Sequence, residues 1–352
     1  MKCGILILCC LQAGLRAQEA DSGFELRATL SGEAAYSHQR EADPLTGGFR
    51  SVLYPTWKID EHWAVSGAVQ IYSQPYFFEQ FATPGYSVKT NILQAHLSYS
   101  KFWKDRSVVI RVGQLPSAFG SFLLRYDDAV NPLIDKPMAY GYYKPVSFNS
   151  LTGAQVDATL GKLDVRAQFA NSSPANPRGI FDRDQYGNWA GGAGYTIRQG
   201  FRVGISAYRG PYLDRNYPYY FPGEAKPRDL PGSGYGVDVA WGRGPWNVHG
   251  ELQRFQMAYR VIPTFNLNTG YAEARRVLHP RWYVAARAGY QRASAFAGNE
   301  AYEVTCGFRP NRYQLVKLGY QVQRGPEIRG TLANTLAVQF VTAFRAISIA
   351  RD

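Results

Sequence analysis

Arginine side chains carry the clearest chemical signal in this chain of 352 residues. The sequence holds 29 arginines and 10 lysines, and its formal net charge is +12 at pH 7. A planar guanidinium binds a carboxylate or a phosphate through paired hydrogen bonds and keeps its charge at any relevant pH. Successive residues of a strand point to opposite faces, so residues at every second position, which we call one parity, share a face. Basic residues recur on one parity of strand-like stretches, at Arg111, Arg166, Arg198, Arg202, Arg287 and Lys317. Cations that share one face of a sheet would attract anions to that face.

More charges gather between residues 116 and 149, where Pro116 ends a strand-like pattern. We expect Arg125, Asp127 and Asp128 of this segment to lie near the wall cations at a narrow point. The same parity also carries acidic residues, so each wall arginine could instead be held in an ion pair. Arg166 with Asp157 is the pair that the spacing favours. Anion binding and structural pairing therefore remain alternatives for each cation.

Patterns for catalysis or metal binding are weak. His96 and Ser98 share a face, but two residues this close on a strand meet often by chance. The stretch 182–188 resembles a calcium loop through Asp182, Asp184 and Asn188, yet it lacks the downstream bidentate glutamate, so a solvated loop is favoured. No phosphate-binding loop or dinucleotide fingerprint occurs. We predict that the protein is not an enzyme and uses no cofactor.

Segments of alternating polarity, each about ten residues long, run from near Phe24 to near Phe344. Longer polar links alternate with seven short links, at 59–62, 101–106, 161–162, 198–200, 242–245, 278–281 and 309–312. Lipid offers no hydrogen-bond partners, so a sheet can cross a membrane only when it is closed. We predict that residues 18–352 form an all-β, antiparallel transmembrane barrel of about 16 strands. The strand expected near residues 267–278 fits either parity poorly.

Tryptophan positions support this prediction. Indole rings favour the interface between membrane and water. Six of the seven tryptophans lie at or near short links, namely Trp57, Trp63, Trp103, Trp241, Trp246 and Trp282. A soluble β-sandwich has no reason to sort its tryptophans by the kind of link. The short links are therefore expected at one membrane interface.

Residues 1–17 read as a secretory signal peptide, with a cation at Lys2, an apolar run and a small residue at Ala17. Its removal would leave Cys306 as the one cysteine, so no internal disulfide can form. Nucleic acid is an unexpected partner for an exported chain, despite its basic charge. We predict an outer-membrane location in a Gram-negative cell, in contact with membrane lipid and lipopolysaccharide.

The interruption at 116–149 is the longest link and is rich in aromatic and aliphatic residues, which argues against disorder. A barrel of this size encloses water, so something is expected to narrow it. We expect the segment to fold inward as a constriction, and an external flap is the alternative. The predicted function is that of a water-filled channel through which small solutes diffuse, with anions favoured over cations. The alternative is a non-conducting barrel with an adhesive, structural or binding role.

Four stretches resemble a known family: "RVGQLPSAFG", "FRPNRYQLVKLGYQVQRG", "HGELQRF" and "RWYVAARAGY" are similar to segments of the phosphate-selective porin O and P group. The resemblance implies a 16-stranded, usually trimeric diffusion channel in the outer membrane. Two departures stand out. The dense ladder of lysine and arginine that phosphate specificity would imply is absent, and Phe344 is followed by "RAISIARD" where an aromatic end is expected. Either those last eight residues fold into the periplasm, or the signal that the assembly machinery recognises differs.

Overall fold

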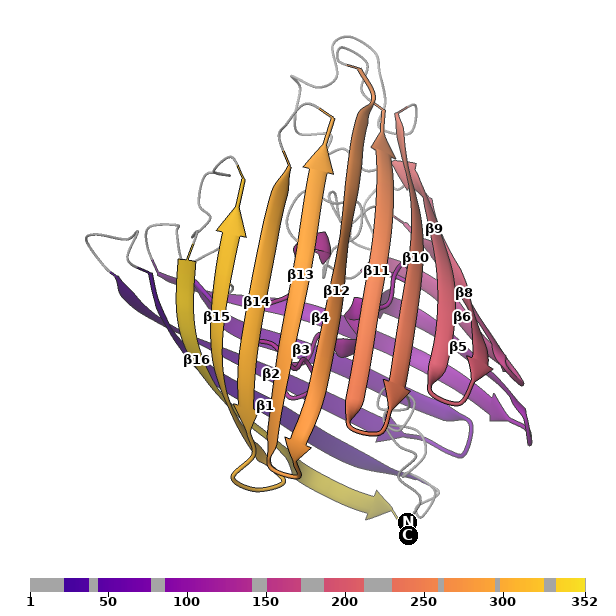
Figure 1. Ribbon diagram of the computed structural model, residues 1–352. Helices are drawn as coiled ribbons and strands as arrows, with labels where there is room; N and C mark the ends of the chain where they lie inside the picture. The colour runs from indigo at the N-terminus through magenta and orange to yellow at the C-terminus, as the bar shows by residue number, and fades with distance from the viewer. Residues whose placement is uncertain are drawn as a thin grey trace.

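Sixteen antiparallel strands close into a barrel in the computed structural model of the chain (Figure 1). The structure describes residues 22–37, 44–76, 86–140, 151–171, 187–211, 230–258, 263–294, 298–325 and 334–351. The predicted signal peptide and the weak calcium-loop candidates Asp182 and Asp184 lie outside these ranges. No helix in the described ranges has the length and apolar character needed to span a bilayer.

The first eight strands are β1 (Ser22–Tyr36), β2 (Leu45–Lys58), β3 (Trp63–Gln74), β4 (Ser87–Phe102), β5 (Arg106–Leu115), β6 (Leu151–Leu160), β7 (Leu163–Ala170) and β8 (Asn188–Arg198). The other eight are β9 (Phe201–Pro211), β10 (Pro231–Arg243), β11 (Trp246–Met257), β12 (Phe265–His279), β13 (Trp282–Ala293), β14 (Asn299–Phe308), β15 (Gln314–Arg324) and β16 (Asn334–Arg351). Two short 3₁₀ turns, η2 (Phe122–Arg125) and η3 (Met138–Tyr140), lie between β5 and β6.

Each strand pairs with its neighbours in the chain, and β1 pairs with β16 to close the ring. The seven short links fall where the alternation predicts them, between β2 and β3 and at every second junction after that. The barrel therefore has two different ends. We call them the short-turn end, where β1 begins and β16 ends, and the long-loop end (Figure 1).

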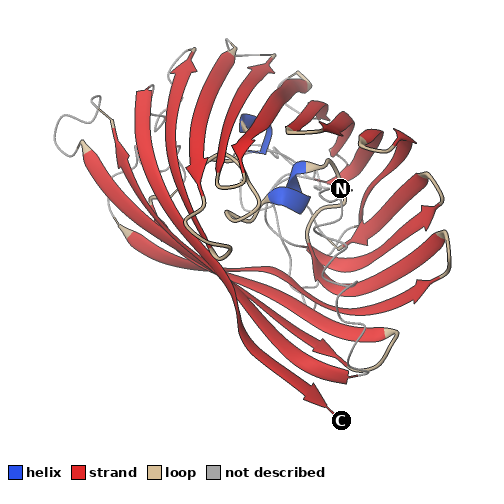
Figure 2. Cartoon of the chain, turned by 60° about the horizontal axis from the view of Figure 1, so that its bottom comes forward, coloured by secondary structure: helices blue, strands red, loops and turns tan. Residues whose placement is uncertain are grey.

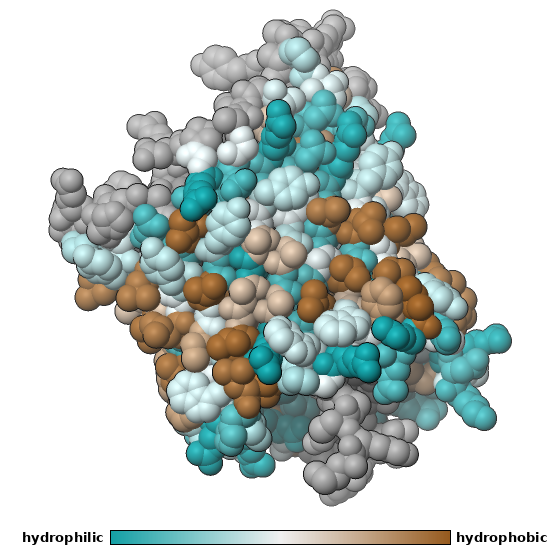
Figure 3. All heavy atoms as spheres, in the orientation of Figure 1, coloured by the Kyte–Doolittle hydropathy of each residue, from teal (hydrophilic) through white to brown (hydrophobic). Residues whose placement is uncertain are grey.

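Side chains alternate between the outer and inner faces because successive residues of a strand point to opposite sides. On β15, Leu318 is 50% exposed whereas its neighbour Lys317 is fully buried. Outward apolar residues form a band across the surface (Figure 3). Trp57, Trp63 and Trp282 are 40–49% exposed close to the short-turn end, as the sequence predicts.

Two strands differ from the expected pattern. On β12 the inner face carries Leu267 and Tyr271, which are buried in an aromatic cluster inside the barrel. Their apolar character explains why the alternation of polarity is poor there. On β16 the residues that follow Phe344 continue the strand, and Arg351 pairs with Ser22 of β1. The last eight residues therefore extend the barrel wall as far as Arg351.

Candidate functional site: the lumen and its inner segment

Residues 116–140, which we call the inner segment, lie inside the barrel with η2 and η3 (Figure 2). Pro116 ends the ladder of β5 because proline has no N–H to donate. Gln168 of β7 then holds the turn into the lumen. Its Nε2 donates to the Pro116 carbonyl at 2.8 Å, and its Oε1 accepts from the Ala118 N–H at 3.0 Å. Residues 141–149 of the predicted loop lie outside the described residues.

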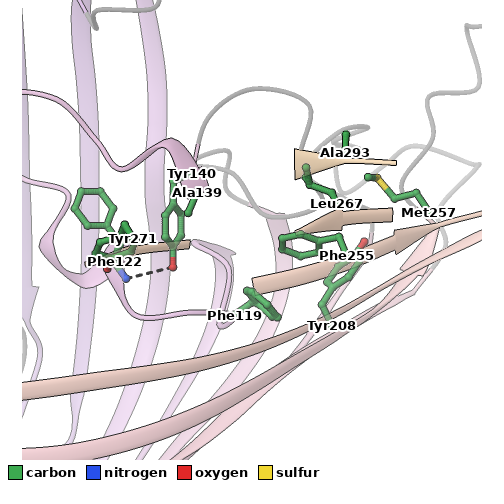
Figure 4. Packing of buried hydrophobic residues seen from close by; sticks show 10 residues of the cluster. All are labelled: Phe119, Phe122, Ala139, Tyr140, Tyr208, Phe255, Met257, Leu267, Tyr271 and Ala293. Carbon is green, nitrogen blue, oxygen red and sulfur yellow. Dashed lines mark hydrogen bonds between the residues drawn. The ribbon is translucent and has the colours of Figure 1, made fainter. Parts of the chain in front are cut away.

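Two phenylalanines anchor the inner segment to the far wall (Figure 4). Phe119 is fully buried, and its ring centroid lies 5.3 Å from that of Phe255 on β11. Phe122 is also fully buried, and its ring centroid lies 6.2 Å from that of Tyr271 on β12. Gly236 of β10 makes room, since a Cβ there would lie 3.2 Å from the Phe119 ring. Burial of each ring contributes about 1.5–3 kcal/mol.

Glu251 of β11 fixes the same part of the segment through hydrogen bonds. The Tyr140 hydroxyl donates to its carboxylate at 2.7 Å, and the Ser121 hydroxyl donates at 3.2 Å. The Tyr140 oxygen also accepts from the Phe122 N–H at 3.3 Å (Figure 4). Glu251 is 2% exposed, so its charge is used in positioning and is not offered to a solute.

Two arginines and two glutamates form a buried network further along. Arg287 of β13 binds Glu273 at 2.8 Å and Glu303 at 3.3 Å, and its Nη1 donates to the Asp135 carbonyl at 2.8 Å. Arg125 of η2 reaches Glu273 at 2.6 Å. Glu303 also accepts from the Ile134 N–H at 2.8 Å. The charges of this network cancel in the interior.

Asp128 is the centre of a third network, which ties the segment to β1, β2 and β15. Arg50 binds its carboxylate at 2.9 Å, and the hydroxyls of Ser31 and Tyr76 donate to it. Lys317 donates to the Asp128 carbonyl at 2.7 Å. Burial alone would raise the pKa of Asp128, but the Arg50 and Lys317 cations outweigh it and hold the pKa below its ordinary value. Asp128 is therefore an ionised structural group.

Partly exposed arginines remain on the arc from β5 to β10, which we call the open arc. Asp157 of β6 accepts from Arg166 Nε at 2.9 Å and also from Arg111 of β5. Arg202 of β9 binds Asp164 at 2.6 Å and Asp238 at 2.7 Å. The side chains of the three arginines are 22–30% exposed, in contrast to 4% for Arg287.

Glycines shape the wall around Arg202. Gly194 of β8 and Gly204 of β9 face the lumen beside it, and a Cβ at Gly194 would overlap the Arg202 guanidinium. A Cβ at Gly204 would overlap the Asp238 carboxylate. The missing side chains thus allow Arg202 to lie flat along the wall between its two carboxylate partners.

The structure sorts the predicted site residues into groups. Arg111, Arg166 and Arg202 lie together on the open arc, and the predicted pair of Arg166 with Asp157 is present. Four other predicted residues are held in ion pairs or hydrogen bonds inside the barrel; Arg125 stays partly exposed and the other three are buried: Arg125, Asp128, Arg287 and Lys317. Parity identifies the inner face of each strand, but it does not show which part of that face the segment covers.

Two more predicted residues, Asp127 and Arg198, have different positions. The Tyr54 hydroxyl donates to Asp127, which is half-buried at the wall. The pairing of β8 with β9 shifts between Thr196 and Arg198, so Arg198 opposes Phe201. Arg202 points inward, so its neighbour Phe201 points outward. Arg198, which lies opposite Phe201, therefore points outward as well. A register shift of this kind has no simple sequence signal.

Arg50 and Glu273 are positioning residues that sequence reasoning missed. The face of β2 that carries Arg50 also carries Gly48 and Val52, so the parity signal is weak. Asn188, a weak calcium-loop candidate, accepts from the Tyr208 hydroxyl at 2.7 Å. Ser98 donates to the Ala64 carbonyl at 3.1 Å. The described residues contain no group of three or more His, Cys, Asp or Glu placed to hold a metal ion.

Comparison with known proteins gives a likeness in fold. No protein-family model matches the chain, and no curated protein matches it. Solved barrels do match, among them OmpT, an outer-membrane protein of Vibrio cholerae in its trimer form, at 11% identity and a TM-score of 0.60. That match covers 92% of this chain and 100% of the other.

Two further matches have similar values. OmpF of Salmonella typhi is 9% identical with a TM-score of 0.63, and covers 92% of this chain and 98% of its own. The outer-membrane channel DcaP of Acinetobacter baumannii is 10% identical with a TM-score of 0.61, and covers 93% and 98%. None of these matches singles out the phosphate-selective group. The chain thus has the fold of outer-membrane porins and channels.

Proposed function

We propose that the chain is a porin of the Gram-negative outer membrane, through which small solutes diffuse between the inner segment and the open arc. The observation that carries this proposal is that the inner segment is fixed to one part of the inner wall and leaves another part less covered. The inner segment is fixed by buried contacts to β11–β15 and to β1 and β2, whereas Arg111, Arg166 and Arg202 on β5, β7 and β9 stay partly exposed. The proposal assigns no catalytic step to the chain.

Anions are the favoured solutes because the open arc has spare donors and few spare acceptors. Each guanidinium carries five N–H donors, whereas a carboxylate accepts through two oxygens. Both oxygens of Asp157 are engaged, by Arg111, Arg166 and Gln155. Within the described residues Arg166 donates to Asp157 through Nε, which leaves its two terminal nitrogens to meet a carboxylate or phosphate. The pairing with aspartates keeps this preference modest.

Planar bilayers with a salt gradient test both parts of the proposal. The purified full chain is expected to give steady ohmic current and a reversal potential on the anion side. A triple variant with Arg111, Arg166 and Arg202 replaced by Gln should shift the reversal potential toward cations. Arg243→Gln, at the exposed short-turn end of β10, is the matched control and should leave it unchanged. A cation-preferring wild type would contradict the anion preference.

A non-conducting barrel is the second candidate function, and one observation favours it. The contacts of the inner segment reach from Gln168 on β7 round to Arg50 on β2, so a large part of the lumen is filled. If the segment closes the remaining gap, the same bilayers will show no steady current in any salt. The protein would then act through its loops or surface.

A further inference from the structure

We propose that four arginines on the outer surface bind the phosphate groups of a glycolipid in the outer membrane leaflet. They lie on alternate strands near the long-loop end, and we call them the arginine band: Arg209 of β9, Arg254 of β11, Arg292 of β13 and Arg324 of β15. The inference concerns the outside of the barrel, so it holds whether or not the lumen conducts.

Strand alternation places the band on the outer face. Arg254 is exposed between the buried Gln253 and the inward Phe255, which packs against the inner segment. The same alternation holds for Arg209, which is exposed between the buried Tyr208 and Gly210. Arg254 and Arg292 both oppose Asn268 of β12, so they share one row of the sheet. Two strand spacings separate them, about 10 Å.

The height of the band fits a headgroup layer. Arg209 lies eight residues after Phe201, the first residue of β9, and Arg292 lies ten residues after Trp282, the first of β13. Tilted strands rise roughly 2.3 Å per residue along the barrel axis, so the band is about 20 Å above the short-turn end. That height is close to the thickness of the apolar band of an outer-membrane barrel.

Outward tyrosines mark the same interface. Tyr235 of β10 is directly opposite Arg254, and Tyr290 precedes Arg292 by two residues on the same face. The Arg324 guanidinium lies 5.9 Å from the ring centroid of Tyr302. Aromatic rings that prefer the interface, with cations beside them, are typical of the boundary between acyl chains and headgroups.

Three of the four band arginines have no ion-pair partner among the described residues of the barrel, and the fourth, Arg324, opposes the exposed Glu300 of β14. Within the described part of the chain, Arg209, Arg254 and Arg292 form no ion pair, whereas Arg111, Arg166 and Arg202 of the lumen are all paired with aspartates. An unpaired arginine at a membrane boundary is stabilised by an anion in the headgroup layer. Phosphate suits it because the guanidinium binds its oxygens in a bidentate way.

The strands that adjoin β15 on its other side, β16, β1 and β2, carry no such band. In the described long-loop halves of β16, β1 and β2, the outward residues are uncharged: Leu336, Val338, Leu30, Gly32, Ala34, Tyr36, Leu45, Gly47 and Phe49. In Figure 3, which turns β10–β16 toward the viewer, hydrophilic residues gather above the apolar band over β11–β13. The arginine band therefore ends at β15 on this side of the barrel.

Lipid binding to the full-length barrel tests the proposal. We would measure retention of bisphosphorylated lipid A by native mass spectrometry for the wild type and for a variant with Arg254→Gln and Arg292→Gln. Each lost arginine should weaken binding about fivefold, from about 1 kcal/mol per cation near a charged lipid surface. The double variant should therefore bind roughly 25-fold more weakly. The matched control replaces Arg243 and Arg281, at the short-turn end, and should bind like the wild type.

The nature of the ligand is tested in parallel. Dephosphorylated lipid A should bind the wild type and the double variant equally and weakly, and inorganic phosphate should not compete with the glycolipid. A β-sheet circular dichroism spectrum and the shift of the barrel on heating in gel electrophoresis show that each variant is folded. Because this readout needs no conductance, it separates the lipid test from the porin proposal. Equal binding of the phosphorylated lipid by the wild type and the double variant would overturn the inference, as would an equal loss in the control.

Discussion

At the scale of the residue, burial decides whether an inward arginine is locked into positioning the chain or stays accessible from the lumen. The Arg287 side chain is 4% exposed and lies between Glu273 and Glu303. The Arg111 side chain is 30% exposed and shares Asp157 with Arg166. Both are inward arginines in ion pairs, and their sequence surroundings do not tell them apart. The difference is made by the inner segment, which covers one of them.

The two arginines therefore predict different effects of the same substitution. Arg287→Gln leaves two buried carboxylates without their shared cation and should lower the free energy of unfolding by about 3–5 kcal/mol. Arg111→Gln breaks a solvent-screened pair and should lower it by about 1 kcal/mol or less. Urea unfolding of the refolded barrel, followed by tryptophan fluorescence, measures both values. Equal effects would mean that the network around Arg287 is open to water.

At the scale of the element, the strands could be predicted from the sequence more completely than the site. Period-two alternation and the short links located all sixteen strands, since each strand must bury one face in lipid. The alternation fails on β12, where Tyr271 faces the inner segment and not water. The contacts of that segment are long-range: Arg125 meets Glu273, and Asp128 meets Arg50. Local patterns contain no information about such pairings.

The inner segment predicts a test of its own anchoring. Phe119→Ala removes a fully buried ring and should lower the stability of the segment by about 3–5 kcal/mol. A loosened segment should make the current fluctuate between levels and should be cleaved faster by protease. Leu124→Ala, in the same segment and 44% exposed, is the matched control and should leave both unchanged. Quiet currents in the Phe119 variant would show that the hydrogen bonds to Glu251 suffice.

At the scale of the whole molecule, the outer surface has two unlike arcs. Cations and tyrosines at the long-loop end of β9–β15 suit a lipid headgroup layer, whereas β16, β1 and β2 offer uncharged, mostly apolar residues at that level. An apolar arc without interfacial cations suits contact with another copy of the chain, since protein there replaces the headgroups. We therefore expect a homotrimer with this arc at its centre.

Gly32 of β1 gives a sharp test of the trimer. It faces outward, and a Cβ built there has no atom of the same barrel within 4 Å, so a bulky side chain is compatible with the isolated barrel. Gly32→Trp should leave the barrel folded but obstruct the close approach of a neighbouring copy. Light scattering in mild detergent should then report monomers in place of trimers. Ala288→Trp, at an exposed outward position on β13, is the control and should remain trimeric. If Gly32→Trp stays trimeric while Ala288→Trp dissociates, the copies meet through the arginine-bearing arc, and the assignment of that arc to lipid fails with it.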